Sequence, residues 1–196
     1  MGDLPVPGFE QPPCQDRRKV LGACTPEPWL DRGSPPHRGD LSPDRPGYHA
    51  AVPEPFRFLF RVRYAECDPQ QIVFNARWAE YVDVAATEYT RELFGSVDPE
   101  AAGVDWRLVR QLVEWRASAR FDDVLVAAVR TVKVGTTSFT LATEFRRQGE
   151  DAVLVTAETV YVVVEPHRPV KLRVPDRHRA ALERGAPGKV VNHAGV

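Results

Sequence analysis

Residues 56–95 have the sequence FRFLFRVRYAECDPQQIVFNARWAEYVDVAATEYTRELFG, which changes its hydrophobic period once. In residues 56–64 every second side chain is apolar or aromatic, and arginines lie between them. This alternation is typical of a β-strand with one buried face. Residues 65–74 contain Pro69 and predict a loop after that strand.

A long amphipathic helix is predicted after the loop. Asn75 is a residue type that favours the N-cap position, and Gly95 is a typical C-terminal stop. Between them the apolar and aromatic side chains recur at helical spacing and form one stripe of about five turns. The stripe consists of Trp78, Tyr81, Val82, Ala85, Ala86, Tyr89 and Leu93.

Four further strands are predicted downstream, over residues 108–119, 124–134, 137–147 and 152–164. Gly135-Thr136 and the stretch from Gln148 to Asp151 have the composition of turns that join antiparallel strands. The last strand is the most apolar and is expected to lie inside the sheet. A short helix over residues 175–184 follows and ends at Gly185. One long helix combined with consecutive antiparallel strands predicts an α+β fold in two layers.

The composition divides the chain at about residue 55. Twelve of the eighteen prolines lie in residues 1–55, where no apolar periodicity occurs, so we expect a Pro-rich disordered segment there. Residues 56–184 are predicted to form one folded domain, and residues 185–196 a flexible tail.

Several classes of protein are excluded by what the sequence lacks. A balance of 26 basic and 27 acidic side chains does not favour nucleic-acid binding. No apolar stretch approaches the ~20 residues that span a bilayer, and the three cysteines form no CxxC pair. We therefore expect a cytoplasmic protein. We also expect no metal or other cofactor, because metal-ligand spacings and nucleotide-binding glycine motifs are missing.

No histidine lies within the predicted core, because two of the five precede residue 55 and three follow the last predicted strand. A catalytic base or nucleophile would therefore have to be a carboxylate. Asp68 lies in the loop just before the helix, whose first backbone N–H groups, around Phe74, Asn75 and Ala76, have no helical partner. A thioester carbonyl placed there would be polarised by these amides beside a carboxylate that can attack it or activate water. The alternative is that Asp68 only shapes the turn.

Residues 64–85, YAECDPQQIVFNARWAEYVDVA, resemble the signature of the 4-hydroxybenzoyl-CoA thioesterase family. In that signature an Asp is followed by a loop that contains Gly. An apolar residue, Val and an aromatic residue come next, just before the helix. Residues 120–125 (RFDDVL) and 134–139 (VGTTSF) are similar to two later family motifs. The resemblance covers residues 56–184 and implies a hotdog fold, in which a five-stranded antiparallel sheet wraps around one long helix.

The resemblance implies that Asp68 is the catalytic carboxylate and that the amide of Asn75 polarises the thioester oxygen. The family usually has Gly where this chain has Gln71, so either the loop differs in shape or Gln71 points into the pocket. The candidate substrate-binding residues are Gln71, Phe74, Lys133, Gly135, Thr136, Arg168 and Lys171. The cations among them are alternatively solvated surface charges. Glu66 is expected to face solvent, Cys67 to be inert, and Trp78 and Trp115 to pack in the core.

The function that follows is hydrolysis of an acyl-CoA or acyl-carrier-protein thioester to free acid and thiol. Asp68 acts as general base or as nucleophile, and the sequence leaves both routes open. The alternative is a non-catalytic acyl-CoA-binding hotdog module. Because one helix cannot cover a five-stranded sheet, we also expect a homodimer or homotetramer. The resemblance to hotdog proteins implies that each site is built from two chains.

Overall fold

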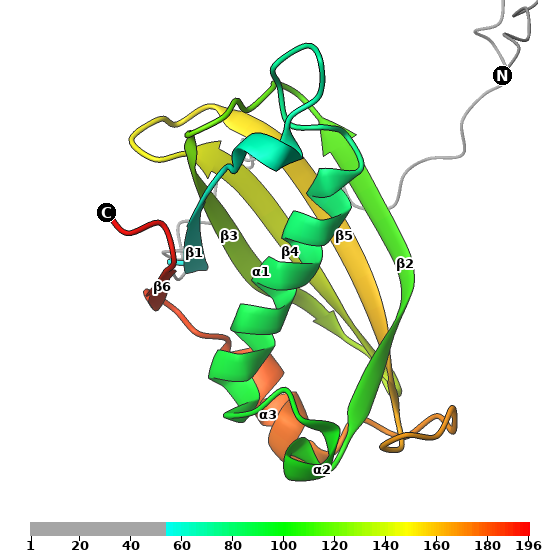
Figure 1. Ribbon diagram of the computed structural model, residues 1–196. Coiled ribbons are helices and arrows are strands. Elements are labelled where there is room, and N and C mark those ends of the chain that lie inside the picture. Colours follow the sequence, from blue (N-terminus) through cyan, green and yellow to red (C-terminus); the bar gives the residue numbers. More distant parts are fainter. Residues whose placement is uncertain (1–53) are drawn as a thin grey trace, which may run out of the picture. The chain divides into compact units, whose positions relative to one another are not determined.

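A computed structural model describes residues 54–196, which form one sheet and a long helix that lies across its face (Figure 1). The predicted disordered segment therefore lies outside the described residues, except for Glu54 and Pro55. The elements are β1 (Phe56–Arg61), a 3₁₀ turn η1 (Tyr64–Glu66), α1 (Arg77–Phe94), α2 (Pro99–Ala102), β2 (Asp105–Trp115), β3 (Val124–Val134), β4 (Ser138–Arg147), β5 (Val153–Val164), α3 (Asp176–Arg184) and β6 (Val190–Asn192).

The sheet has the strand order β2-β5-β4-β3-β1-β6. The five strands β1 to β5 pair antiparallel, which confirms the predicted hotdog arrangement, and β6 adds a parallel pairing to β1. Strand β5 lies between β2 and β4, as its apolar sequence predicts. The two predicted turns join β3 to β4 and β4 to β5, and in the second Gly149 has φ 81°.

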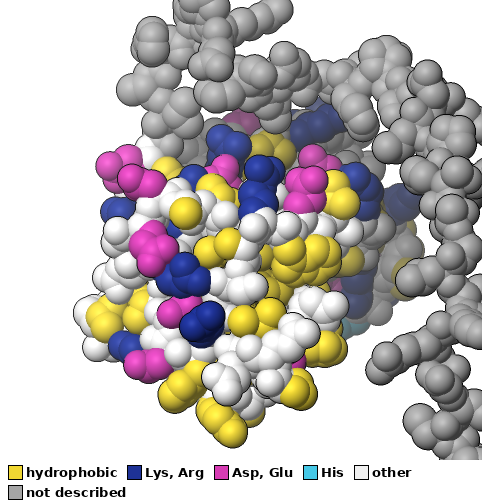
Figure 2. Space-filling model, turned by 90° about the horizontal axis from the view of Figure 1, so that it is seen from above, with side chains coloured by type: hydrophobic (Ala, Val, Ile, Leu, Met, Phe, Trp, Pro, Cys, Tyr) yellow, Lys and Arg dark blue, Asp and Glu magenta, His cyan; other side chains and the backbone are white. Residues whose placement is uncertain are grey.

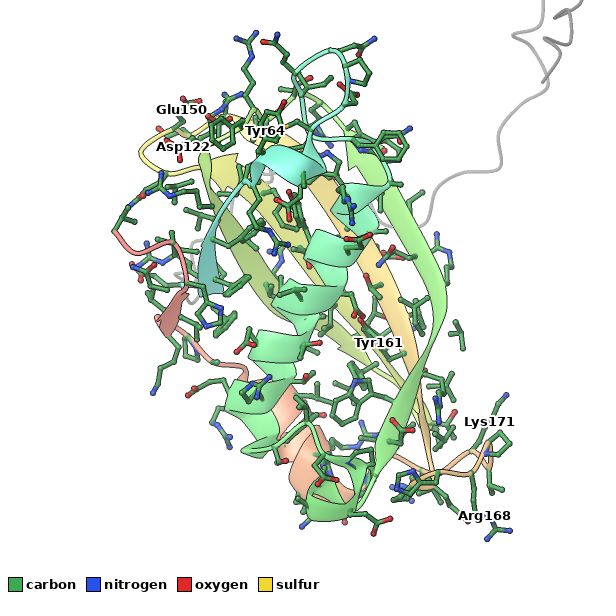
Figure 3. All side chains as sticks on the ribbon, viewed as in Figure 1. Tyr64, Asp122, Glu150, Tyr161, Arg168 and Lys171 are labelled. Atoms are coloured by element: carbon green, nitrogen blue, oxygen red, sulfur yellow. The ribbon has the colours of Figure 1, made fainter. Side chains whose placement is uncertain are left out.

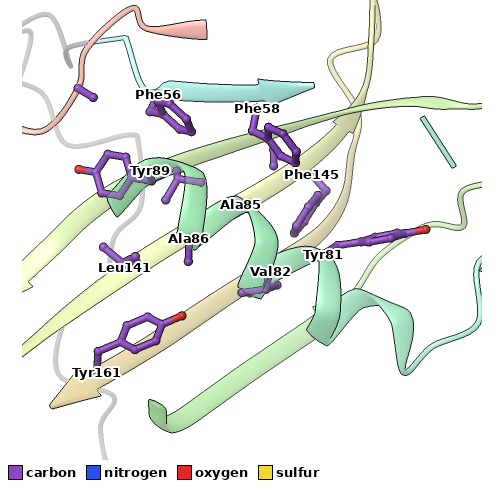
Figure 4. Packing of buried hydrophobic residues seen from close by; sticks show 14 of the residues in the cluster. Phe56, Phe58, Tyr81, Val82, Ala85, Ala86, Tyr89, Leu141, Phe145 and Tyr161 are labelled. Atoms are coloured by element: carbon purple, nitrogen blue, oxygen red, sulfur yellow. The ribbon is translucent and has the colours of Figure 1, made fainter. Parts of the chain in front are cut away.

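The core lies between α1 and the sheet (Figure 4). All seven side chains of the predicted helical stripe are buried, and they pack against aromatic and aliphatic side chains such as Phe56, Phe58, Leu141 and Phe145. Each large apolar side chain that is fully buried contributes about 1.5–3 kcal/mol relative to an exposed one. This packing holds the start of the helix at a defined place above the sheet.

Strand β1 ends earlier than the alternation predicts. It stops at Arg61, and the chain then forms the 3₁₀ turn in which Tyr64 is 81% exposed. The alternation of faces is lost there, so the side chains that follow do not keep the orientation that a continuous strand would give them.

The prediction of a flexible C-terminal tail is wrong for part of residues 185–196. The N–H of Arg57 donates to the Lys189 carbonyl at 2.9 Å, and the N–H of His193 donates to the Leu59 carbonyl at 2.7 Å. Strand β6 therefore satisfies backbone groups that would otherwise be free on the outer edge of β1. Val191 also packs on the core, and Ala194 is buried.

Candidate active site

The loop that carries Asp68 is closed by its own backbone. The N–H of Asp68 donates to the Ile72 carbonyl at 2.9 Å, and the N–H of Gln71 donates to the Asp68 carbonyl at 2.8 Å. Neighbouring segments hold it too, because the N–H of Val73 donates to the Ala119 carbonyl at 2.8 Å. The loop thus presents Asp68 on a fixed backbone.

Gln71 has φ 63°, the left-handed conformation that glycine adopts most easily. Its side chain is exposed and is not part of the pocket beside Asp68. The loop therefore takes the conformation expected of the family's glycine although this chain has Gln71. The proposed role of Gln71 in substrate binding has no support in the single chain.

The Asp68 side chain is half-buried and faces a pocket of about 400 Å³. Its Oδ1 accepts a hydrogen bond from the N–H of Gln70 at 2.8 Å. The second oxygen, Oδ2, accepts no hydrogen bond from any residue in the 54–196 range. One carboxylate oxygen is thus held in place, and the other is free to accept a proton or to attack.

The backbone donors just before α1 follow Asp68 by six to eight residues in the sequence. The N–H of Phe74 is not free, because it donates to the Glu66 carbonyl at 2.9 Å. The N–H groups of Asn75 and Ala76 have no acceptor among the described residues, and Asn75 lines the pocket together with Asp68. The N-cap position belongs to Ala76, not to Asn75 as predicted. The pocket therefore combines a carboxylate with an unsatisfied helix N-terminus, where negative charge is stabilised.

The other walls of the pocket come from the loop and from the end of β2. The residues lining the pocket are Asp68, Gln70, Ile72, Val73, Phe74, Asn75, Trp78, Trp115, Arg116, Ala117 and Ser118. Trp78 is buried as predicted, but Trp115 is 55% exposed and forms a pocket wall instead of packing in the core. The sequence analysis also missed Arg116, because only the folded sheet brings the end of β2 beside the loop. Arg116 forms no ion pair within the described part of the chain.

Glu66 is buried, which contradicts its predicted orientation toward solvent. Arg63 donates to its Oε1 through Nε at 2.8 Å and Nη2 at 2.5 Å, while the N–H of Arg63 and the Tyr81 hydroxyl reach Oε2 at 2.7 and 2.8 Å. Burial alone would raise the pKa of Glu66, but the hydrogen bonds from Arg63 and Tyr81 lower it below its ordinary value. Burial of Tyr81 itself and its hydrogen bond to the Glu66 carboxylate raise the pKa of Tyr81. This cluster fastens the start of the Asp68 loop to α1.

The thiol next to Asp68 is not activated. Burial raises the pKa of Cys67, and Glu66 and Asp68 add a smaller effect in the same direction. A raised pKa keeps the thiol protonated near neutral pH and unreactive. This agrees with the expectation that Cys67 takes no part in the chemistry.

Most of the predicted substrate-binding residues lie at the other end of the molecule. Arg168 and Lys171 are far from Tyr64, which starts the turn leading to the Asp68 loop (Figure 3). The turn with Gly135 and Thr136 belongs to the same distant end, because the Thr136 carbonyl accepts from the N–H of Val174 and the Gly135 carbonyl from Arg179. Lys133 lies at the end of β3 that leads into this turn. Of the predicted set, a single chain brings only Asp68, Phe74 and Asn75 together.

The end of the molecule with the Asp68 loop is viewed directly in Figure 2, where hydrophobic side chains adjoin both Lys or Arg and Asp or Glu side chains. No group of three or more His, Cys, Asp or Glu side chains that could hold a metal ion occurs in residues 54–196. No described helix is long and apolar enough to cross a bilayer.

Part of the chain matches a known protein family. Residues 70–154 match the family model of the thioesterase superfamily, a match that begins two residues after Asp68. This part of the chain is therefore similar to the thioesterase superfamily. A comparison with curated protein sequences gave no match.

Solved structures with the same fold include several acyl-CoA thioesterases. A 1,4-dihydroxy-2-naphthoyl-CoA thioesterase from Synechocystis is 18% identical, with a TM-score of 0.59 over 65% of this chain and 94% of the other. A gentisyl-coenzyme A thioesterase is 21% identical, with a TM-score of 0.56 over 65% and 98%. A mutant of 4-hydroxybenzoyl-CoA thioesterase in complex with 4-hydroxybenzoyl-CoA is 17% identical, with a TM-score of 0.59 over 64% and 96%. The described residues thus have the hotdog fold of thioesterases.

Proposed function

We propose that this protein hydrolyses an acyl-CoA thioester to the free acid and CoA, with Asp68 as the catalytic carboxylate. The observation that carries the proposal is the pocket shared by the Asp68 carboxylate and the free N–H of Asn75. A thioester oxygen at this N–H would gain negative charge in the transition state, where an oriented backbone donor stabilises it most.

Two routes use the same atoms. As a general base, Asp68 takes a proton from water while the hydroxyl oxygen bonds to the acyl carbon. The tetrahedral intermediate then expels the thiolate, which takes the proton from Asp68 and restores the carboxylate. As a nucleophile, an Asp68 oxygen bonds to the acyl carbon, the thiolate leaves, and water then hydrolyses the mixed anhydride and restores the carboxylate. Both routes consume one water and release one acid and one thiol. The unbonded Oδ2 is suited to either.

Aromatic acyl groups are the first class to test. The exposed rings of Phe74 and Trp115 line the pocket and offer apolar walls. The similar structures named above include thioesterases for dihydroxynaphthoyl-, gentisyl- and 4-hydroxybenzoyl-CoA. A carrier protein could present the acyl group in place of CoA, because both use the same pantetheine arm.

We further propose that the working unit is a homodimer that pairs the β2 edges. Strand β2 is at the end of the sheet and exposes Leu108, Val109 and Leu112, each about half accessible. A two-fold axis would place one copy's distant end beside the other copy's Asp68 pocket. That arrangement would bring the second copy's Lys133, Arg168 and Lys171 toward the phosphates of CoA, together with Arg116 of the first.

The test is thiol release from a panel of benzoyl-, 4-hydroxybenzoyl-, naphthoyl- and straight-chain acyl-CoAs. We expect turnover by the wild type on at least one aryl-CoA. Binding of acyl-CoA without thiol release from any compound would support the non-catalytic module instead. The unsatisfied carboxylate oxygen and amide favour the enzyme, because a module that only binds does not need them.

A further inference from the structure

A second pocket, of about 450 Å³, lies between β1, α1 and the C-terminal segment. None of its lining residues belongs to the Asp68 pocket, so the two are separate. Its size is in the range of sites that hold small organic ligands. The proposed hydrolysis does not use this pocket.

Aromatic rings form its walls. Phe60 stacks on Phe58 with ring centroids 5.3 Å apart and meets Tyr81 of α1 edge-on at 4.7 Å. The ring of His193 contacts Phe58 edge-on at 5.1 Å. The apolar part of a ligand can pack against the edges and the faces of these rings, the arrangements that aromatic contacts prefer.

The C-terminal segment closes one side of the pocket and is held there by hydrogen bonds. The backbone of His193 is bonded to β1, and the N–H of Ala194 donates to Asn192 Oδ1 at 2.9 Å. Both His193 and Ala194 line the pocket. The segment predicted as a flexible tail thus supplies a wall of this cavity.

Some hydrogen-bond donors that line the pocket have no acceptor among the described residues. Glu66 is the acid in the lining, and each of its oxygens already accepts two hydrogen bonds. Arg63 uses Nε and Nη2 on Glu66, and Arg61 uses Nη1 on Asp122 at 3.0 Å. The remaining guanidinium N–H groups of Arg61 and Arg63 have no acceptor among the described residues. A ligand with hydrogen-bond acceptors can bind these N–H groups, and a carboxylate matches a guanidinium best.

We propose that this pocket binds a monocarboxylic acid with an aromatic or similarly bulky apolar body. The apolar part packs among Phe58, Phe60 and Tyr81, and the carboxylate reaches the free N–H groups of Arg61 and Arg63. The site is distinct from the one where the proposed reaction takes place. Its existence does not depend on whether the protein hydrolyses thioesters.

The test is titration calorimetry of the full chain with 2-naphthoate, with 2-naphthamide as the uncharged match. We expect saturable binding of the acid and binding of the amide at least about tenfold weaker, a factor that corresponds to about 1.4 kcal/mol. No binding of the acid at millimolar concentration, or equal binding of acid and amide, would overturn the proposal.

Three variants test which of the two pockets binds the ligand. Val84 is 46% exposed at the pocket, so Val84→Trp fills the space without disturbing the core, while Val132→Trp makes the same change at an exposed position of β3 outside both pockets. Ser118→Trp fills the Asp68 pocket. We expect at least about tenfold weaker binding for Val84→Trp and wild-type binding for the other two. If Ser118→Trp lost binding while Val84→Trp bound as the wild type does, the acid would lie in the Asp68 pocket and the proposal would be contradicted.

Arg61→Gln provides a test that leaves the space open. The Arg61 side chain is 38% exposed and pairs with Asp122, so the substitution removes one cation and this surface ion pair. We expect binding of 2-naphthoate to weaken by about fivefold or more while binding of 2-naphthamide stays the same, because a charge-assisted hydrogen bond is lost. Unchanged binding of the acid would remove Arg61 from the site and contradict the proposed recognition of a carboxylate.

Discussion

Glu66 is the residue whose environment differs most from its chemical type. A buried carboxylate costs several kcal/mol of desolvation unless donors compensate it. Here Arg63 and Tyr81 supply three side-chain hydrogen bonds, and the N–H of Arg63 supplies a fourth. Since Glu66 is two residues before Asp68 and Tyr81 belongs to α1, these bonds link the loop to the helix.

Replacing Glu66 by Gln tests how much this cluster contributes to the free energy of unfolding. The side chain of Arg63 is 80% exposed, so water screens part of the pair and we expect a loss of about 1–3 kcal/mol in the free energy of unfolding at pH 7. The lowered pKa of Glu66 stabilises the fold above its ordinary titration range, and this stabilisation disappears as the pH falls through the pKa of the folded state. The difference between wild type and Glu66→Gln should therefore shrink in acid.

Urea unfolding from neutral to acidic pH measures both quantities. Glu80→Gln is the matched control, because Glu80 is exposed and pairs with Arg77 on the helix surface. It should change the free energy of unfolding by less than about 0.5 kcal/mol. A Glu66→Gln variant as stable as Glu80→Gln would show that the cluster does not hold the loop.

Single residues near the site were the least predictable part. The alternation of residues 56–64 correctly identified the buried face of β1, but the strand ends at Arg61 and the following turn directs Glu66 inward. The left-handed backbone of Gln71 does not follow from its residue type, because residues other than glycine rarely adopt it, and only the family's glycine at this position pointed to it. Both depend on how the loop closes, which local sequence does not specify.

The start of α1 is the element on which the proposed chemistry depends. The helical stripe and the stop at Gly95, which has φ 75°, were predictable because they follow from spacing and from one residue type. The N-cap was not, because the turn before the helix adds Asn75 and Ala76 outside it. That turn leaves the amides of both residues without acceptors.

Asn75→Pro removes the proposed donor while the chain can still fold, because the N–H of Asn75 takes part in no hydrogen bond in residues 54–196. Proline is tolerated near the first turn of a helix for the same reason. We expect kcat to fall by about 10²–10³-fold, the usual effect of losing one oxyanion donor. The free energy of unfolding, measured in urea, should change by no more than about 1 kcal/mol.

Asn75→Ala is the matched control, since it removes the side chain and keeps the N–H. Its kcat should stay within about threefold of the wild type, a difference under about 0.7 kcal/mol. If Asn75→Ala lost as much activity as Asn75→Pro, the side chain and not the backbone amide would be the functional group.

Strand β6 shows the limit of element prediction from sequence. It has three residues, too few for a period to be recognised, and it follows glycines and a proline that are typical of a loop. Its position is set by the free edge of β1, a feature of the assembled sheet. The longer strands β3, β4 and β5 were found within one residue of their predicted bounds because eleven, ten and twelve residues give a clear alternation or apolar run.

At the scale of the whole molecule, a single copy does not bring the proposed catalytic carboxylate and the proposed phosphate-binding cations together. The cations expected to hold phosphate lie at the opposite end of the sheet from Asp68 (Figure 3). A family motif pointed to Asp68, whereas the cations were only candidate substrate-binding residues, and the distance between the two groups emerges only from the strand directions. A second copy joined at β2 is the arrangement that would reunite them.

Leu112→Lys tests this assembly. The substitution places a charge on the exposed edge strand β2, where Leu112 is 47% accessible, so the single chain should tolerate it while a paired edge should not. We expect sedimentation equilibrium to give twice the chain mass for the wild type and the single-chain mass for Leu112→Lys, with thioester hydrolysis lost in parallel. Val132→Lys, an equally exposed change on β3, should leave the assembly intact. A fully active single-chain species would contradict the two-copy site.

The most direct test of the whole account is kcat for thiol release by Asp68→Asn, compared with Asp151→Asn, a matched change at an exposed turn residue. Asn keeps the size of the side chain and can neither take a proton nor attack a carbonyl. We predict a loss of at least about 10²–10⁴-fold for Asp68→Asn, with an unchanged urea midpoint, and near wild-type turnover for Asp151→Asn. Turnover by Asp68→Asn within a few-fold of the wild type would contradict the assignment of Asp68 as the catalytic group.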